Sequence, residues 1–411
     1  MFGFTGRQVN PAVIEGRDNL NMTSTNHEIL IRKERLLSKT RSAYPGMRTG
    51  PVREIAPTLD FKGFHELWKQ AWGDTYALRP VFDYDPAYLE WAFGDEALTS
   101  PLSFAAADEA DLAGVVLHAH RELMHEGKRI TAGMPGGLSI RPDIKGAMLA
   151  KVLSLLYIEQ AVEDLDALFM WFDTSTRAPQ KVGAVYRRMY GHGLKLAGDS
   201  VCIGTCEMVT KPHDPVRIQR LLPVKRHEAF MSRAVVAFDR CFPARPRGHV
   251  ATIDTGSVDE AREFANRCAE LGGYGRVFGE QEFGRYTLYK NPETGVGPFS
   301  ALMRHRGRIR AIGVGYPLTV ICLGKRDTSF YIPCLTFDSQ CTPSERSAFA
   351  SHFANMAREA CNSCCTLTMC PLGIAARFVS TGLRFVCFGV PLRGALAVVD
   401  AKNPTRTIDF R

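Results

Sequence analysis

A basic turn that contains a glycine is the part of this sequence best suited to bind an anion. Residues 138–150 (LSIRPDIKGAMLA) predict the end of a strand, a turn with Lys145 and Gly146, and the start of an apolar helix that continues to Gln160. A helix N-terminus presents unpaired backbone N–H groups, which stabilise a phosphate or pyrophosphate. Lys145 adds a cation and Gly146 permits close backbone approach. The alternative explanation is an ordinary strand-to-helix turn of an α/β protein.

Two histidines form a second candidate for chemistry. His118 and His120 stand two residues apart in a segment, residues 112–121, that is predicted to be a strand, so they share one face. Such a pair could act as a general base or, with a third ligand, hold a metal ion. No third ligand is evident from the sequence. The alternative is a partly exposed pair on a sheet face.

The cysteines predict core thiols rather than a metal site. The chain has twelve cysteines without a regular framework, which indicates reduced thiols. Four of them, Cys361, Cys364, Cys365 and Cys370, lie near one another in the sequence. Neighbouring strand residues point to opposite faces, so Cys364 and Cys365 cannot easily share a tetrahedral ion. We therefore predict that no metal is bound.

The elements that must position these residues alternate between strand and helix. Apolar runs and turn residues predict strands at residues 103–107, 112–121, 129–140, 167–172 and 200–208, and helices at residues 148–160 and 182–190. The basic turn joins the third strand to the first helix. This order predicts a mixed α/β fold with helices packed on a sheet.

Length, composition and charge limit the classes of protein. A chain of 411 residues with 45% hydrophobic residues can form two or three domains with full cores. No apolar run reaches the roughly 18 residues that indicate a membrane span. The N-terminus lacks a signal-peptide pattern, so we expect a cytoplasmic protein. A net charge of +8 suits an anionic cofactor, and no sequence signature predicts specific nucleic-acid binding.

The chain divides into an arm, two similar halves and a connector. Residues 1–50 are polar and basic, and we expect a mobile arm or a weak anchor to an anionic surface. Residues 51–210 form the first domain, and residues 211–247 form a connector that contains proline. Residues 248–411 repeat the order of elements, but residues 338–345 replace the basic turn by an acidic helix start. Acidic residues repel phosphate, so one cofactor site is predicted, in the first half.

The order of elements over residues 100–208 resembles the acyl-CoA-dependent N-acyltransferase (GNAT) superfamily. Residues 82–93 (FDYDPAYLEWAF) are similar to a motif that N-myristoyltransferases carry just before their first sheet strands. Residues 58–60 and 66–68 resemble a further pair in that family. The resemblance implies an α/β (α+β) chain of two tandem GNAT-like folds with mixed central sheets flanked by helices. It also leads us to expect a monomer.

The resemblance implies acyl-CoA as co-substrate and places its diphosphate at the basic turn. The residues so assigned are Ile140, Arg141, Lys145, Gly146, Ala147, Met148 and Leu149. Met148 stands where the broad superfamily usually has a second glycine. N-myristoyltransferases also lack that glycine, but they have more basic residues in this turn than Lys145 alone.

The same resemblance implies the groups that act on the thioester. The backbone N–H groups of Gly137 and Leu138 would stabilise the oxyanion, and residues 134–137 predict an irregular strand or bulge that could free them. Tyr186 would protonate the CoA thiolate, unless it is a core tyrosine. The terminal carboxylate of Arg411 would act as base.

The sequence leaves the base and the substrates open. Residues 129–140 contain no carboxylate, so the base could be His118, His120 or the terminal carboxylate of Arg411. We expect transfer of an acyl group, myristoyl being one candidate, from CoA to an amine, with a peptide N-terminus as the expected acceptor. The alternatives are a short-chain acetyltransferase acting on a small-molecule amine and a catalytically degenerate binding protein of the same fold.

Overall fold

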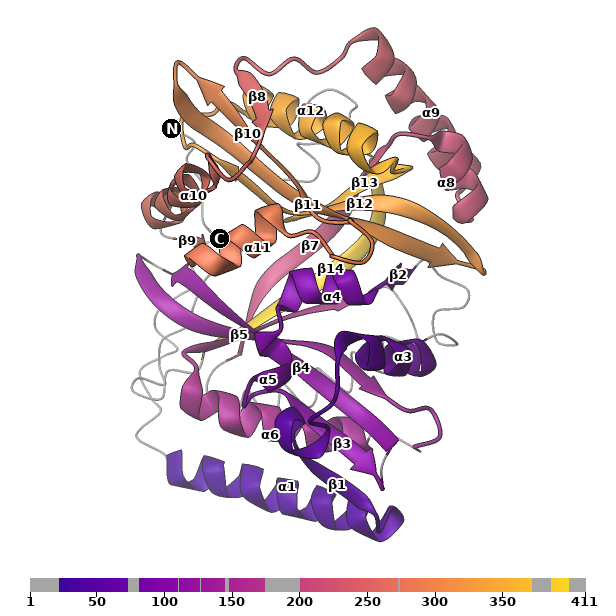
Figure 1. Cartoon of the computed structure of the whole chain (residues 1–411), viewed down its shortest axis with the longest axis vertical. Coiled ribbons are helices and arrows are strands. Elements are labelled where there is room, and N and C mark those ends of the chain that lie inside the picture. The colour runs from indigo at the N-terminus through magenta and orange to yellow at the C-terminus, as the bar shows by residue number, and fades with distance from the viewer. Residues whose placement is uncertain are drawn as a thin grey trace, which may run out of the picture.

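One continuous mixed sheet with helices on its faces organises the chain (Figure 1). The computed structural model describes residues 22–72, 81–109, 111–125, 127–144, 148–173, 200–272, 274–371 and 386–398. Within these ranges, twelve strands follow the order β1-β3-β4-β5-β6-β14-β7-β13-β12-β11-β10-β8, while β2 pairs with β11 and β9 pairs with β4. The mixed α/β architecture is the one predicted.

The first half of the chain follows the predicted order of elements. It comprises α1 (Met22–Ala43), β1 (Met47–Pro51), α2 (Val52–Ile55), α3 (Phe61–Trp72), β2 (Val81–Asp83), α4 (Pro86–Phe93), α5 (Glu96–Thr99), β3 (Phe104–Asp108), β4 (Asp111–His125), β5 (Lys128–Ile140), α6 (Met148–Asp164), β6 (Ala167–Asp173) and β7 (Ser200–Pro212). The five strands and the helix at residues 148–160 are confirmed. The helix predicted at residues 182–190 lies outside the described residues.

The second half repeats the strand order of the first. It comprises α8 (Pro215–Leu221), α9 (Arg226–Cys241), β8 (His249–Thr252), α10 (Val258–Gly272), β9 (Tyr274–Val277), α11 (Glu280–Leu288), β10 (Phe299–His305), β11 (Arg308–Cys322), β12 (Lys325–Phe337), α12 (Pro343–Cys361), β13 (Cys365–Pro371) and β14 (Val386–Val398). The run β10-β11-β12-α12-β13 matches β3-β4-β5-α6-β6. The expected connector, residues 211–247, contains two helices, α8 and α9.

The two halves exchange their last strands. Strand β14, from the end of the chain, pairs antiparallel with β6 of the first half. Strand β7, from the end of the first half, pairs antiparallel with β13 of the second half. These two strands also pair with each other at the centre of the sheet. Each half of the sheet is therefore completed by a strand of the other, and the boundary near residue 210 divides the sequence without dividing the fold.

The expected mobile arm is a docked helix from Met22 onward. Helix α1 packs along α6, where the Nζ of Lys33 donates to both carboxylate oxygens of Glu159 at 2.7 and 2.9 Å. Leu37 and Thr40, one turn apart on α1, are buried. The expectation of a solvated arm was wrong for this part of the chain, because a few buried side chains suffice to dock an otherwise polar helix.

The first-half sheet buries apolar side chains on both faces. On one face, Ala106 and Val116 pack against Leu153 and Tyr157 of α6. On the other face, Val115 and its neighbours pack against α3, α4 and α5. The side chains of adjacent strand residues therefore pack into different hydrophobic clusters, because successive side chains point to opposite faces of the sheet. In the described part of the chain, no helix has the length and apolar character needed to cross a membrane.

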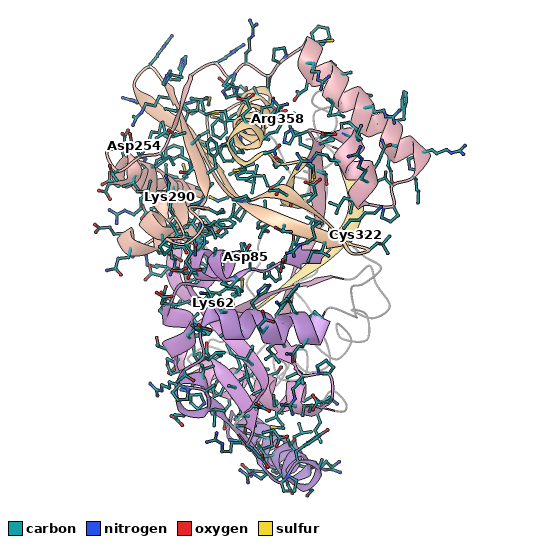
Figure 2. The ribbon with its side chains drawn as sticks, turned by 45° about the vertical axis from the view of Figure 1, so that its right-hand side comes forward. Lys62, Asp85, Asp254, Lys290, Cys322 and Arg358 are labelled. Carbon is teal, nitrogen blue, oxygen red and sulfur yellow. The ribbon has the colours of Figure 1, made fainter. Side chains whose placement is uncertain are left out.

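The motif at residues 82–93 forms one of the contacts between the halves. Asp85, labelled in Figure 2 near their junction, caps α4 by accepting from the Tyr88 N–H at 2.8 Å. Trp91 of α4 stacks on Tyr286 and Tyr316 of the second half, with ring centroids 4.8 and 4.7 Å apart. Its indole N–H donates to the Tyr286 carbonyl at 3.0 Å. A segment of the first half is therefore part of the core of the second half.

Candidate functional site

A β-bulge lies where the sequence predicted irregular backbone. Val115 of β4 is opposite Ser139 of β5 and Leu117 is opposite Gly136, so Gly137 and Leu138 together face one residue. Gly137 has a φ of +62°, and a Cβ there would lie 2.4 Å from the Cζ of Phe64. Both the backbone conformation and the packing therefore require glycine. A bulge takes a residue out of the strand ladder, which can make its N–H available to a ligand.

The second half carries the same bulge with one decisive difference. Val314 of β11 is opposite Cys334 of β12 and Tyr316 is opposite Tyr331, so Ile332 and Pro333 occupy the places of Gly137 and Leu138. Proline has no backbone N–H. The bulge of the second half therefore lacks one of the two backbone N–H groups that the bulge of the first half has.

The pairing of neighbouring strands also ends earlier beside the bulge of the first half than beside the bulge of the second. The described parallel pairs between β5 and β6 are Ala132 with Ala167 and Gly133 with Leu168, and the pairing ends before the bulge. In the second half, β12 and β13 remain paired from Ser329 as far as Ile332, which is part of the bulge. Where two neighbouring strands are no longer paired, a ligand can lie between them.

The predicted strand–turn–helix arrangement lies directly after the bulge. Ile140 ends β5, the Arg141 N–H donates to the Ala113 carbonyl at 2.9 Å, and Met148 begins α6. Leu149 is buried in the core beneath the sheet, so it can contact a ligand only through its backbone. Lys145, Gly146 and Ala147 lie outside the described residues.

Arg141 is surrounded by carboxylates. Its Nε lies 2.7 Å from Asp143 Oδ1, and its Nη2 lies 3.5 Å from Asp108 Oδ2. The hydrogen bond that Arg141 donates to the Asp143 carboxylate raises the pKa of Arg141 above its ordinary value. A shallow pocket beside this group is lined by Gln70, Asp111, Arg141, Pro142 and Asp143. A phosphate here would compete with Asp143 for the guanidinium, a competition that the sequence did not reveal.

The two histidines share a face of β4, as predicted, but differ in environment. His118 is buried, and its Nδ1 lies 3.1 Å from the hydroxyl of Tyr157 on α6. Burial, with smaller contributions from His120 and Arg121, lowers the pKa of His118 to about 3. A histidine with so low a pKa is a weak base, and its contacts favour a structural role. His120 is exposed.

We expect His118 to make the protein more stable at pH 7 than at pH 5. The folded pKa of about 3 is below the unfolded value of about 6.5, so this stabilisation is complete above pH ~6.5 and is lost as the pH falls toward 3. Between pH 7 and pH 5 the loss is about 2 kcal/mol. Urea unfolding should show this drop in the native protein and not in His118→Gln, which cannot titrate. An equal pH dependence of the two proteins would contradict it.

A histidine–aspartate pair near the bulge was missed by sequence reasoning. The Nε2 of His65 on α3 lies 2.7 Å from Asp83 Oδ1, and Arg326 of β12 also pairs with Asp83. Burial favours a higher pKa for Asp83, but His65 and Arg326 outweigh it and lower the pKa. The preceding residue in the helix, Phe64, packs against Gly137 of the bulge. The local signal was weak, because 18 residues separate His65 from Asp83.

No metal site is evident in the part of the chain that the structure describes, where no three His, Cys, Asp or Glu side chains are grouped as ligands. Cys364 and Cys365 are buried with their Sγ atoms 3.9 Å apart. The hydrogen bond with Cys364 and burial raise the pKa of Cys365 well above its ordinary value, so its thiol keeps its proton. The absence of a bound metal stays a prediction.

The repeated unit of strands, bulge, turn and helix, with exchanged last strands, defines a tandem GNAT-like fold. Solved structures agree. Saccharomyces cerevisiae N-myristoyltransferase with bound myristoyl-CoA matches 89% of this chain and 87% of its own, with 13% identity and a TM-score of 0.61. The same yeast enzyme with myristoyl-CoA and inhibitors matches 89% and 84%, with 14% identity and a TM-score of 0.62. No family model and no curated protein sequence matches the chain. The chain therefore has the fold of N-myristoyltransferases, as the resemblance predicted.

Two of the expected catalytic groups cannot be placed. Tyr186 and the terminal residue Arg411 lie outside the described residues. Their roles as acid and base stay predictions, like those of Gly137 and Leu138.

Proposed function

We propose that this protein is an acyl-CoA-dependent N-acyltransferase whose single acyl-CoA site lies in the first half. The observation that carries the proposal is the difference between the two bulges. Gly137 and Leu138 have two N–H groups beyond the point where β5 and β6 cease to pair, whereas the second half has lost one donor at Pro333 and keeps its strands paired as far as Ile332. Two backbone donors that converge on a thioester carbonyl would stabilise the oxyanion formed on attack.

The reaction follows from these groups. A base takes a proton from the ammonium form of the acceptor, and the free amine attacks the thioester carbonyl carbon. The tetrahedral oxyanion would be bound by the N–H groups of Gly137 and Leu138. Its collapse breaks the C–S bond, and the attacking nitrogen releases its extra proton to solvent. The products are an amide and the CoA thiolate, which would take a proton from Tyr186; Tyr186 then regains a proton from solvent. The turn from Ile140 to Leu149 would hold the diphosphate of CoA.

The three candidate functions differ in the acyl-CoA that they require. The fold supports a long-chain acyl group and a peptide N-terminus as acceptor. Neutralisation of Arg141 by Asp108 and Asp143 favours the alternative of a degenerate binding protein. Calorimetric titration of the purified protein with myristoyl-CoA, acetyl-CoA and free CoA separates them. We expect myristoyl-CoA to bind most tightly; a preference for acetyl-CoA indicates a short-chain enzyme, and no binding indicates a scaffold.

Deleting residues 409–411 should lower turnover far more than acyl-CoA affinity. A terminal carboxylate has an ordinary pKa of about 3.5, and a drier site raises it toward a useful base. Steady-state kinetics with a peptide acceptor, combined with the same titration, measure both quantities. The comparison variants are His120→Ala and His65→Ala. If the truncated enzyme turns over normally and one histidine variant is inactive, the base is that histidine.

A further inference from the structure

One side of α9 exposes arginines and large apolar side chains to solvent. Arg226, Arg233 and Arg240 are seven residues apart, so they follow one side of the helix, and all three are exposed. Phe230, four residues after Arg226 and three before Arg233, lies on that side and is 70% exposed. The opposite side packs on the protein through Val235. In Figure 1, α8 and α9 form an outer edge of the molecule.

The segments next to α9 extend this surface, which we call the α8–α9 surface. Val216 in α8 and Phe242 directly after α9 are 53% and 61% exposed. Side chains of both helices extend into solvent in Figure 2. The exposed cations of the surface are Arg220, Lys225, Arg226, Arg233, Arg240, Arg245 and Arg247. None of the seven forms an ion pair with another described residue, but Arg247 interacts electrostatically with Glu345 at longer range, which leaves six without an acidic partner.

The acidic residues of the same stretch do not neutralise these cations. Glu228 is engaged at the start of α9, where its Oε2 accepts from the Lys225 backbone N–H at 2.6 Å. Asp239 pairs with the ammonium of Lys211, which is fully buried in β7. The α8–α9 surface therefore combines an uncompensated positive field with exposed apolar side chains.

We propose that the α8–α9 surface binds an anionic lipid bilayer. When such a surface rests on a membrane, its exposed phenylalanine and valine side chains leave water at the interface, and its arginine guanidinium groups contact lipid phosphates. Phenylalanine rings can also stack on nucleic-acid bases, whereas the exposed aliphatic side chain of Val216 cannot, so lipid is the ligand that uses all three exposed apolar side chains. This proposal does not depend on the proposed catalytic activity, because α9 is remote from the bulge of the first half (Figure 1).

Vesicle flotation with the full chain tests the proposal. We expect binding to vesicles of phosphatidylcholine with 30% phosphatidylserine, weak binding to pure phosphatidylcholine, and release in high salt. Each cation near an anionic leaflet strengthens binding roughly fivefold, so Arg226→Gln, Arg233→Gln and Arg240→Gln together should weaken binding about a hundredfold. Phe230→Ser with Phe242→Ser should weaken it at unchanged charge, which a purely electrostatic contact would not show.

A matched control changes the same charge at the other end of the molecule. Arg35→Gln, Arg41→Gln and Arg53→Gln alter exposed arginines at α1 and α2 and should leave vesicle binding unchanged. Thermal unfolding verifies that each variant folds. Equal losses from both triple variants would overturn the proposal, as would binding to single-stranded RNA, but not to anionic vesicles, that the α9 triple variant abolishes.

Discussion

Replacing Leu138 by proline should lower the rate of acyl transfer by about 10²- to 10³-fold, the usual effect of removing one oxyanion donor. The change copies the second half, where Pro333 occupies the same place in the same bulge. Because a proline is already accommodated at that place, the backbone should tolerate the substitution. Single-turnover kinetics with bound acyl-CoA measure the effect on the chemical step, and calorimetry should show acyl-CoA affinity largely unchanged.

Two further variants make this test specific. Leu138→Ala keeps the N–H and removes only side-chain packing, so it should retain most of the activity. Pro333→Leu restores an N–H in the second half and should leave turnover within about twofold, since the proposed acyl-CoA site lies in the first half and the second half has no basic turn after its bulge. If Leu138→Ala is as inactive as the proline variant, packing rather than hydrogen bonding explains the loss, and the assigned oxyanion site is wrong.

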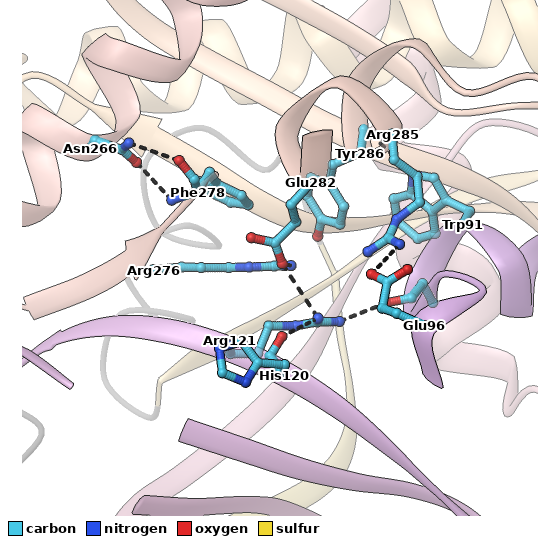
Figure 3. A network of polar contacts seen from close by, with 11 residues as sticks. Trp91, Glu96, His120, Arg121, Asn266, Arg276, Phe278, Glu282, Arg285 and Tyr286 are labelled. Carbon is cyan, nitrogen blue, oxygen red and sulfur yellow. Dashed lines mark hydrogen bonds and ion pairs between the residues drawn. The ribbon is translucent and has the colours of Figure 1, made fainter. Parts of the chain in front are cut away.

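Replacing Glu282 by alanine should destabilise the protein by about 3 kcal/mol, because it leaves two largely buried guanidinium groups without their shared carboxylate. The Oε1 of Glu282 on α11 lies 2.5 Å from Arg276 of β9 and 3.4 Å from Arg121 of β4 (Figure 3). Burial and the nearby Arg276 lower the pKa of Arg121 to about 9. The carboxylate thus joins the two halves of the chain.

The surroundings of these arginines explain why the cost is large. Arg276 lies over the rings of Phe278 and Tyr286, at 4.6 and 4.7 Å from their centroids, so it cannot turn readily toward solvent. The Nη2 of Arg121 donates to the Ala92 carbonyl at 2.6 Å. Both side chains are therefore held in place when the carboxylate is removed.

Urea unfolding at pH 7 measures the effect, with two controls. Glu282→Gln keeps the shape and one acceptor and should lose less stability than the alanine variant. Adding Arg121→Met to Glu282→Ala should recover part of the loss, since one stranded charge is removed. A loss below about 1 kcal/mol for Glu282→Ala would show that solvent screens this group as it does a surface ion pair.

The sequence by itself determined the order of elements and the local irregularities. Alternation and apolar runs located the five strands from β3 to β7, and Thr342 with Glu345 provides the capping box that begins α12 at Pro343. The glycines at positions 136 and 137 predicted the bulge. These features depend on residues close to one another in the chain, so their physical causes are present in any short window of sequence.

The tertiary structure alone decided which distant segments meet. The side-chain alternation of β7 suits pairing with β6 as well as with β13. Only the complete sheet shows that β7 pairs with β13 and that β14 pairs with β6. Neutralisation of Arg141 by Asp108 and the buried contact of His118 with Tyr157 likewise join residues more than thirty positions apart. The periodicity of a strand fixes which of its faces is buried but not which strand lies beside it, because pairing depends on the packing of the whole chain.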